Sequence, residues 1–294
     1  MAVNLAKKYS DKIAKYFTLK SVVDGNTSND YKFTGVKTIE IYTPITQPLS
    51  DYNRTGIHRY GTPSEMQDTI QELSLSKDRS FSITIDRGNN SEQMSVKEAG
   101  KMLALELEEQ VIPEMDKYAL VKFIDNAGKI KELSAAPTDS DIISTLSEAM
   151  IYLSNNNVPK DDRIIYIGWS YFGMMRVANE FIGNDMLGKQ ILEKGALGQF
   201  MGAAVVPVPD NYLVKNGKKC YFLIAHKNSV LQPKTIQDYF VKQNPPGING
   251  ALLEGRFRYD AFVLGAKADG VAAYVESSAC TAAPTNTYTS STKT

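Results

Sequence analysis

Histidine and cysteine, the side chains that most often bind transition metals, are scarce in this chain, with two of each among 294 residues. The cysteines, Cys220 and Cys280, lie far apart and match no metal-binding or redox spacing. The histidines, His58 and His226, have no carboxylate at the spacing of a metal site. The sequence therefore predicts no metal and no cofactor, and it leaves a disulfide between the two cysteines open.

Long apolar runs are also missing, and neither sign of charge is in excess. No stretch of about 18 apolar residues occurs, so the sequence predicts no membrane-spanning helix. Lys+Arg and Asp+Glu balance at 33 each, which argues against a whole surface built to neutralise phosphates. The first twenty residues are a local exception. Their lysines form either a solvated helix face or a contact with nucleic acid or an acidic neighbour, and they include Lys7, Lys8, Lys12 and Lys15.

The first third of the chain predicts an arm followed by an extended projection. Residues 4–17 place apolar side chains on one helical stripe, and residues 23–31 have the composition of a linker. Residues 37–42 and 81–85 alternate as strands. Roughly forty mostly polar residues separate them, which is unusually long for a loop in a compact domain. We expect a two-stranded projection with little core of its own, which lies on another subunit.

The rest of the chain predicts one long helix followed by alternating helices and strands. Residues 95–118 carry apolar side chains every three or four positions, and Pro113 predicts a kink or a break. Further helices are expected at 140–155 and 171–181. Strands are expected at 163–168, 203–207, 220–226, 251–264 and 270–276. The class is α+β with mixed sheets, and the tail from residue 277 has the composition of a disordered segment.

Two segments come close to catalytic motifs. Ser170 follows an expected strand as a hydrolase nucleophile would, with Asp185 or Asp210 and then His226 further along. However, Phe172 stands where that turn needs a small residue, so Ser170 is predicted to cap the following helix. Residues 183–190 resemble a phosphate-binding loop, but Gln190 replaces the magnesium-binding hydroxyl residue and the preceding segment is helical. We interpret them as an exposed turn.

The order of these parts resembles the major capsid proteins of tailed bacteriophages, which have the Hong Kong 97 phage-type capsid fold. Several stretches are similar to that family in their residues as well as in their layout. The similarity extends over about residues 8–277 and rests on 8–10 with Phe17, 31–38, 41–61, 76–87, 113–118 and 255–264.

This resemblance implies a division into five parts. They are an N-terminal arm (1–36), an extended β loop with adjoining strands (37–93), a peripheral domain with the spine helix (94–128), a mixed-sheet axial domain whose late strands partly return to the peripheral domain (129–278), and a disordered tail (279–294). The implied function is a shell subunit and not an enzyme. It assembles through pentamers and hexamers into an icosahedral head in the host bacterial cytoplasm. Its implied partners are further copies of itself, a scaffolding protein, the portal, decoration proteins and packaged double-stranded DNA, with no membrane.

The candidate contact residues follow from the same resemblance. Ile39, Ile41, Phe81 and Ile83 are expected to be buried on the adjacent subunit, and exposed charge pairs are expected to fix the register. An encapsulin-type compartment remains the alternative within the shell class, and a serine hydrolase using Ser170 remains the alternative outside it. The candidates for subunit contacts are Tyr9, Phe17, Arg54, Arg59, Lys77, Asp78, Arg79 and Phe81, and those for arm or DNA contacts are Lys7, Lys8, Lys12 and Lys15.

Overall fold

The computed structural model describes residues 20–31, 33, 38–55, 57–63, 65–88, 99–177, 198–247 and 249–277. Their contacts divide the chain into two compact units. The first comprises Met1–Ala119 and Val230–Lys267, and the second comprises Leu120–Ser229 and Ala268–Thr294. The arm helix, the 183–190 segment and the tail from residue 278, all interpreted from sequence, lie outside the described residues. Within the described part, no helix has both the length and the apolar character needed to cross a bilayer.

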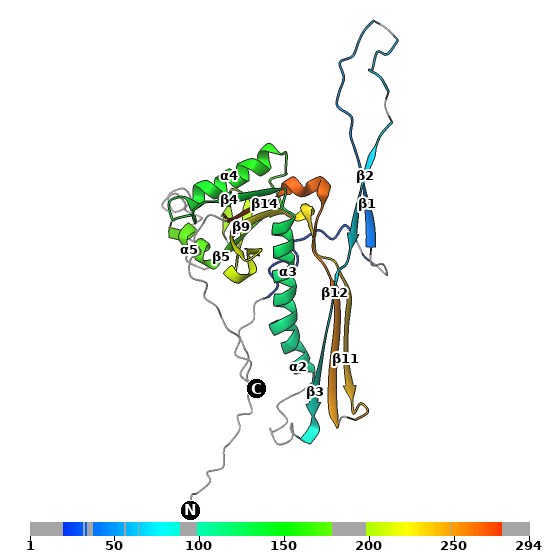
Figure 1. Cartoon of the computed structure of the whole chain (residues 1–294), viewed down its shortest axis with the longest axis vertical. Coiled ribbons are helices and arrows are strands. Elements are labelled where there is room, and N and C mark those ends of the chain that lie inside the picture. The colour runs from blue at the N-terminus through cyan, green and yellow to red at the C-terminus, as the bar shows by residue number, and fades with distance from the viewer. Residues whose placement is uncertain are drawn as a thin grey trace, which may run out of the picture. The chain divides into compact units, whose positions relative to one another are not determined.

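The first unit contains a three-stranded antiparallel sheet of strands that are far apart in the sequence. Its order is β11 (Lys234–Gln243), β12 (Gly250–Tyr259) and β3 (Lys77–Asp86), as Figure 1 shows. In the register, Gly255 lies opposite both Phe81 and Tyr239. A Cβ on Gly255 would come within 2.4 Å of the Phe81 ring, so glycine is needed there for the ring to lie across β12.

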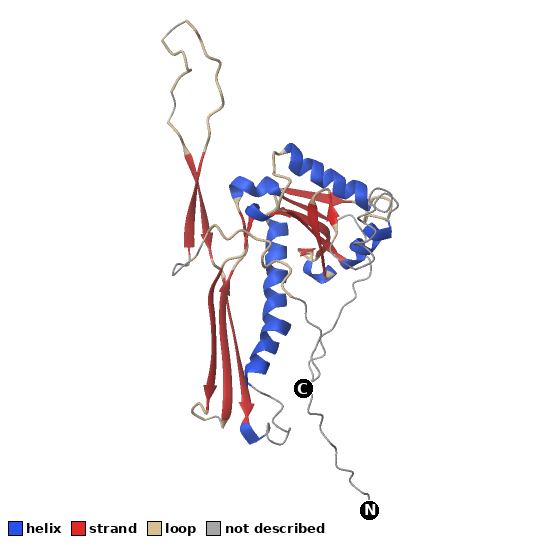
Figure 2. Cartoon of the chain, turned by 180° about the vertical axis from the view of Figure 1, so that it is seen from behind, coloured by secondary structure: helices blue, strands red, loops and turns tan. Residues whose placement is uncertain are grey.

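A long helical segment runs beside this sheet, as both views show (Figures 1 and 2). It consists of α2 (Ala99–Glu106), a π-helical turn η1 (Leu107–Val111) and α3 (Ile112–Asp125). The predicted interruption at Pro113 takes the form of this π turn, in which the Ile112 N–H bonds to the Leu107 carbonyl. Because proline has no N–H and its ring clashes with the carbonyl four residues earlier, a widened turn lets the helix continue.

The predicted apolar stripe of this helix packs on the sheet. Ala99 and Leu103 contact the cluster of Ile85, Ala251 and Leu253. One and two turns further on, a second cluster joins the helix to the other end of the strands, and its members are Leu107, Val111, Met115, Tyr118, Phe81, Phe257 and Tyr259.

A second pair of strands forms a ribbon in which β1 (Thr38–Pro44) is antiparallel to β2 (Asp68–Ser74). The expectation that residues 37–42 and 81–85 form one projection is therefore wrong, because 81–85 belong to β3 and pair with β12. The ribbon base has its own core, in which Ile41 and Leu73 are buried with Phe33, Leu75, Leu231 and Leu264. Ile41 is thus buried within its own chain, as are parts of Ile39, Phe81 and Ile83.

The second unit is built on a seven-stranded mixed sheet. Two pairs of neighbouring strands in this sheet are parallel, β5 (Arg163–Gly168) with β7 (Ala203–Val208) and β4 (Lys129–Leu133) with β14 (Val271–Glu276). The other pairs are antiparallel. The order is β4 (Lys129–Leu133), β14 (Val271–Glu276), β9 (Lys218–His226), β5 (Arg163–Gly168), β7 (Ala203–Val208) and β6 (Gln199–Phe200), with β8 (Val214–Lys215) on β9.

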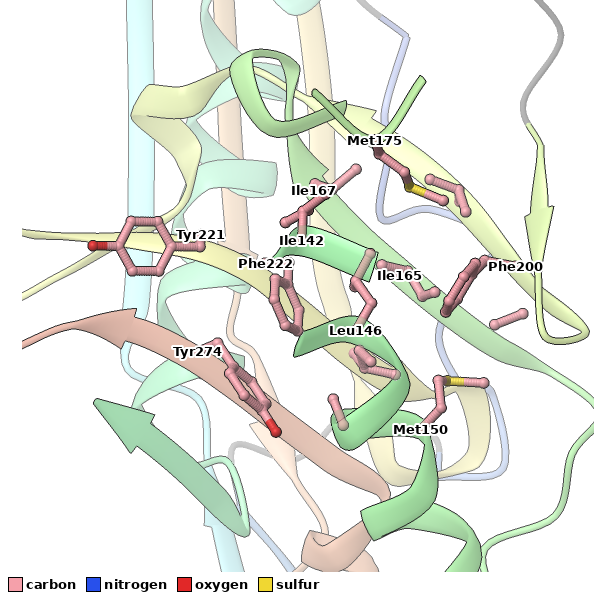
Figure 3. Packing of buried hydrophobic residues seen from close by; sticks show 14 of the residues in the cluster. Ile142, Leu146, Met150, Ile165, Ile167, Met175, Phe200, Tyr221, Phe222 and Tyr274 are labelled. Carbon is pink, nitrogen blue, oxygen red and sulfur yellow. The ribbon is translucent and has the colours of Figure 1, made fainter. Parts of the chain in front are cut away.

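Helices α4 (Ile142–Asn155) and α5 (Trp169–Val177) belong to the same unit. The apolar side of α4 contributes Ile142, Leu146 and Met150 to the core of this unit. Each of these three side chains is at most 1% exposed. Figure 3 shows these side chains against Phe222 and Tyr274 of the sheet, whose rings stack at 4.6 Å. Each such buried side chain stabilises the fold by about 1.5–3 kcal/mol.

Most of the predicted elements of this unit are confirmed, but several strands of both units were not predicted. The strand at 163–168 has the predicted bounds, and the helix at 140–155 begins two residues later than predicted. The expected strand at 251–264 is instead two strands, β12 and β13 (Phe262–Val263), of which β13 pairs with β10 (Val230–Leu231). Strands β4, β6, β8, β10 and β11 were not predicted.

Candidate functional site

The part of the ribbon beyond its strands exposes large apolar side chains. The Ile45 N–H bonds to the Gln67 carbonyl at 2.7 Å, and among the described residues between these two no strand forms. Ile57 is 95% exposed and Tyr60 is 87% exposed. Soluble proteins rarely leave many large apolar groups uncovered in one place. Leu49 is fully exposed, and Ile45, Tyr52 and Met66 are also exposed beyond the strands, as are Tyr42 and Ile70 within them.

This ribbon tip, residues 45–67, has internal contacts in spite of its exposure. The Asn53 N–H bonds to the Arg59 carbonyl at 3.0 Å, and the Ser50 hydroxyl donates to the Tyr60 carbonyl at 3.1 Å. The rings of Tyr52 and Tyr60 meet edge to face at 5.1 Å. The tip is therefore shaped by its own contacts, but it leaves most of its apolar surface exposed.

Two polar side chains fix the base of the ribbon to the rest of the first unit. The Gln71 amide donates to the Val263 carbonyl at 3.2 Å and accepts the Gly265 N–H at 2.8 Å. Asp260, which is buried, accepts the Ser76 N–H at 2.7 Å. Sequence reasoning missed both residues. The available signal for Asp260 was a single acid within an otherwise apolar run, residues 259–264.

The charged candidates in β3 have partners in their own chain. Asp78 accepts two bonds from Arg256, at 3.0 and 2.7 Å, and these lower the pKa of the Asp78 carboxyl. Arg79 donates to Glu114 at 2.8 Å. The ammonium group of Lys77 lies 5.2 Å from the centre of the Tyr118 ring. The charge pairs expected between subunits are thus occupied within the chain at Asp78 and Arg79.

The other candidates divide into exposed residues and residues outside the described part. Arg54 and Arg59 are exposed in the ribbon tip, whereas Phe81 stacks on Phe257 with ring centroids 6.0 Å apart. The arm candidates lie outside the described residues, and they are Tyr9, Phe17, Lys7, Lys8, Lys12 and Lys15.

The expected linker at 23–31 is instead docked on the first unit. The buried carboxylate of Asp116 accepts the Ser21 hydroxyl at 2.7 Å and the Val22 N–H at 2.8 Å. Burial raises the pKa of Asp116, and these two bonds oppose that shift. Val23 is completely buried, and Ser28 bonds through its N–H to the Val230 carbonyl at 2.9 Å. The polar composition of this segment reflects hydrogen bonding to the body.

Ser170 does not cap α5, as had been predicted, because it lies inside the first turn of that helix. The cap is Asp210, whose carboxylate accepts both the Ser170 N–H, at 3.4 Å, and the Ser170 hydroxyl. His226 lies opposite Arg163, at the other end of β5 from Ser170. A serine nucleophile needs its base within hydrogen-bond reach, so these residues do not form the hydrolase arrangement.

The few potential metal ligands remain dispersed. Within the described ranges, no three His, Cys, Asp or Glu side chains lie close enough to hold an ion. Cys220 is a free, buried thiol whose pKa is raised by burial to about 12. Cys280 lies outside the described residues.

The sequence matches no family model and no curated protein, but its structure is similar to solved phage structures. A protein of Mycobacterium phage Che8 superposes with a TM-score of 0.75 at 17% identity, covering 92% of this chain and 96% of that one. The capsid of the cyanophage P-SCSP1u gives 0.75 at 12% identity, with 92% and 93% covered. The mature capsid of bacteriophage PhiM1 gives 0.72 at 10% identity, with 94% and 93% covered.

These similarities extend over almost the whole of each chain, and they confirm the fold expected from the resemblance. The chain has the Hong Kong 97 phage-type fold of tailed-phage capsid proteins.

Proposed function

We propose that this chain is a major capsid protein, a structural subunit and not an enzyme, which assembles through pentamers and hexamers into the icosahedral head of a tailed bacteriophage. The fold supports this proposal, since chains of similar structure form the capsids of the cyanophage P-SCSP1u and of bacteriophage PhiM1. A closed shell repeats one subunit through contacts between unlike surfaces that close on themselves. Such a subunit needs a surface that is incomplete until a neighbour covers it.

The exposed apolar surface of the ribbon tip is the observation on which the proposal rests. Its base is fixed by a core and by the bonds of Gln71 and Asp260, whereas Leu49, Ile57 and Tyr60 of its tip are almost fully exposed. A rigidly based projection with an apolar end loses little conformational entropy when it docks, which favours binding. The partner we propose is the adjacent copy of the chain.

The energy of each contact is modest, and repetition makes the shell stable. Covering Leu49, Ile57 and Tyr60 would contribute about 1.5–3 kcal/mol for each side chain that becomes fully buried. The exposed charges of Arg54 and Arg59 would add about 0–1 kcal/mol for each pair formed. Because every subunit both inserts a ribbon and receives one, these terms add around each ring.

The further roles belong to the same proposal. The second unit would be the axial domain, which lines the centres of the rings, and the first unit would supply the arm, the loop and the peripheral domain. A scaffolding protein, the portal and decoration proteins would be the other protein partners. Packaged double-stranded DNA would lie on the inner face, where Lys7, Lys8, Lys12 and Lys15 are the candidate contacts. The protein would reside in the virion after assembly in the host cytoplasm.

The experiment removes the ribbon tip and leaves its base. Residues 46–66 are replaced by Asn-Gly, because Ile45 and Gln67 are already joined by a hydrogen bond across the ribbon and a two-residue turn closes such a pair. A longer deletion through β2 would also remove Leu73 and Leu75 from the core. We expect a folded subunit that forms no shells in negative-stain images, whereas the unaltered chain forms them. Normal shells from the shortened chain would refute the role of the ribbon.

The contents of the shells identify their class. Nuclease-protected DNA in particles from infected cells would support the capsid proposal. Particles that enclose a folded enzyme and no DNA would instead indicate the encapsulin-type compartment.

A further inference from the structure

Strand β11 is the outer strand of the three-stranded sheet, and among the described residues it pairs only with β12. Figure 1 shows β12 and β3 lying between β11 and α2, and Figure 2 shows the same order from behind. The outer edge of a sheet presents N–H and C=O groups that can pair with another chain. Proteins usually protect such an edge with charges or proline along its length.

The middle of β11 has apolar side chains where such protection would be expected. Tyr239, Phe240 and Val241 are 41%, 54% and 42% exposed. Because side chains alternate along a strand, Tyr239 and Val241 share one face, and Phe240 shares the other with Asp238 and Lys242. The charges thus flank the apolar centre, one of each sign, at equal distances from Phe240.

The hydrogen-bond pattern between β11 and β12 shows which backbone groups of β11 point toward the outer edge. The Asn244 N–H bonds to the carbonyl of Gly250, the residue directly opposite it, at 2.6 Å. In an antiparallel pair these bonds recur at every second residue. The backbone N–H and C=O groups of even-numbered residues of β11 therefore point toward β12. Those of odd-numbered residues point toward the outer edge. Tyr239 and Val241 are thus the residues whose backbone can bond a further strand.

We propose that β11 pairs antiparallel with β11 of a second copy of this chain, about a two-fold axis through Phe240. In this register Tyr239 of each copy lies opposite Val241 of the other, and the two exchange both backbone bonds. Asp238 of each copy lies opposite Lys242 of the other, so two pairs of opposite charge form on the face that carries the two Phe240 rings. Cross-strand pairs of these kinds stabilise sheets, and a two-fold axis creates each of them twice.

This contact differs in kind from the contact of the ribbon. The ribbon joins unlike surfaces, as a ring requires, whereas the β11 pair uses the same surface on both partners, as a two-fold axis requires. Its place in a shell, joining subunits of different rings, rests on the proposed function. The pairing itself does not.

A cysteine on the proposed axis tests the register. Phe240 faces Phe240 of the other copy as a non-hydrogen-bonded pair, whose Cα atoms lie about 4.5 Å apart, within the range that a disulfide can bridge. In a C280S background, Phe240→Cys should form a disulfide-linked dimer under mild oxidation. Cys220 gives little background because it is buried.

A matched control lies on the same strand. The two copies of Gln243 would be about 20 Å apart in this register, so Gln243→Cys should stay monomeric on the same non-reducing gel. Equal crosslinking by the two variants, or none by Phe240→Cys, would overturn the proposal. Protection of β11 in assembled particles without the Phe240→Cys crosslink would show that a different partner covers this edge, and would also overturn it.

A second test reverses the charges of Asp238 and Lys242 on separate copies of the chain. Asp238→Lys alone places lysine opposite lysine twice, and Lys242→Asp alone places aspartate opposite aspartate twice. A mixture of the two variants restores opposite charges at both positions. Self-association of either variant should weaken roughly tenfold relative to the unaltered chain and should recover in the mixture. This comparison also controls for the bond between Lys242 and Glu254 within the chain (2.6 Å), because the mixture does not repair it.

The outcomes separate this inference from the proposed function. Crosslinked dimers without shells would support the β11 pair and count against the capsid role. Closed shells in which Phe240→Cys never crosslinks would leave the capsid role intact and refute the β11 pair.

Discussion

The carboxylate of Asp260 accepts the backbone N–H of Ser76 at 2.7 Å, although 184 positions separate the two residues. The same carboxylate accepts the Tyr118 hydroxyl at 2.9 Å and the Ala261 N–H at 2.8 Å. It therefore joins three segments at one buried point: the start of β3, the long helix and the turn after β12. The ribbon projects from this point, so its direction is set by a polar contact as well as by packing.

Replacing Asp260 by alanine should destabilise the subunit. The change leaves three donors without their acceptor, and a buried donor that loses its partner costs about 1–3 kcal/mol. Because the Tyr118 hydroxyl also lies 3.3 Å from the Ser76 hydroxyl, we expect a total loss of about 3 kcal/mol in urea unfolding. Asp51→Ala, at an exposed position in the ribbon tip, serves as the control and should change stability by less than about 0.5 kcal/mol. Equal losses of unfolding free energy at the two positions would show that the hydrogen bonds of Asp260 do not stabilise the subunit.

The ribbon tip should be dispensable for folding and required for assembly. The double variant Leu49→Ser, Ile57→Ser removes apolar groups that are almost fully exposed in the subunit. Its thermal midpoint should match that of the unaltered chain, while sedimentation should show subunits in place of shells. A lower midpoint would mean that these side chains pack on their own chain, contrary to their exposure.

Asp116 should make the stability of the folded chain depend on pH. Its pKa is raised by burial, so the folded chain binds a proton at a higher pH than the unfolded chain does. Between the ordinary aspartate pKa of about 3.9 and the raised value, stability increases as pH falls. This contribution is fully present below pH ~3.9 and is lost as pH rises through the folded pKa.

Asp116→Asn is the matched variant, since it keeps the shape of the side chain and carries no titrating group. From pH 7 toward pH 4, urea unfolding should show the unaltered chain gaining stability relative to the variant. A difference that stays constant over this interval, or that changes in the opposite direction, would contradict a raised pKa at this site.

The contact between Asp210 and Ser170 should stabilise helix α5 and should have no catalytic role. Asp210→Ala removes the cap of α5 and should cost about 0.5–2 kcal/mol in unfolding free energy, whereas Ser170→Ala removes only the hydroxyl bond and should cost less. Neither the unaltered chain nor Asp210→Ala should react with a fluorophosphonate probe. Labelling of Ser170 that disappears in His226→Ala would restore the hydrolase interpretation.

Sequence reasoning succeeded where the signal is local. The strand at 163–168 is a continuous apolar run that is buried throughout, and the spine helix was found because its apolar spacing matches the face that packs on β3 and β12. The resemblance to capsid proteins predicted the fold, which the structural similarities confirm.

The failures involve pairing over long distances. Residues 81–85 alternate as a strand, but nothing in them specifies that the partner is β12, about 170 residues later. Strand β11 was missed because its apolar centre is short and both faces are exposed, so no alternation marks it. Asp116 and Asp260 were missed because a buried acid is recognised by its donors, and those donors are distant in the sequence.

The most direct test is a cryo-electron microscopy reconstruction of particles formed by the purified chain. The account predicts a closed icosahedral shell in which residues 45–67 of each subunit lie against an adjacent copy and Leu49, Ile57 and Tyr60 are covered. A chain that stays monomeric at all concentrations, or a particle in which this segment contacts only its own subunit, would contradict it.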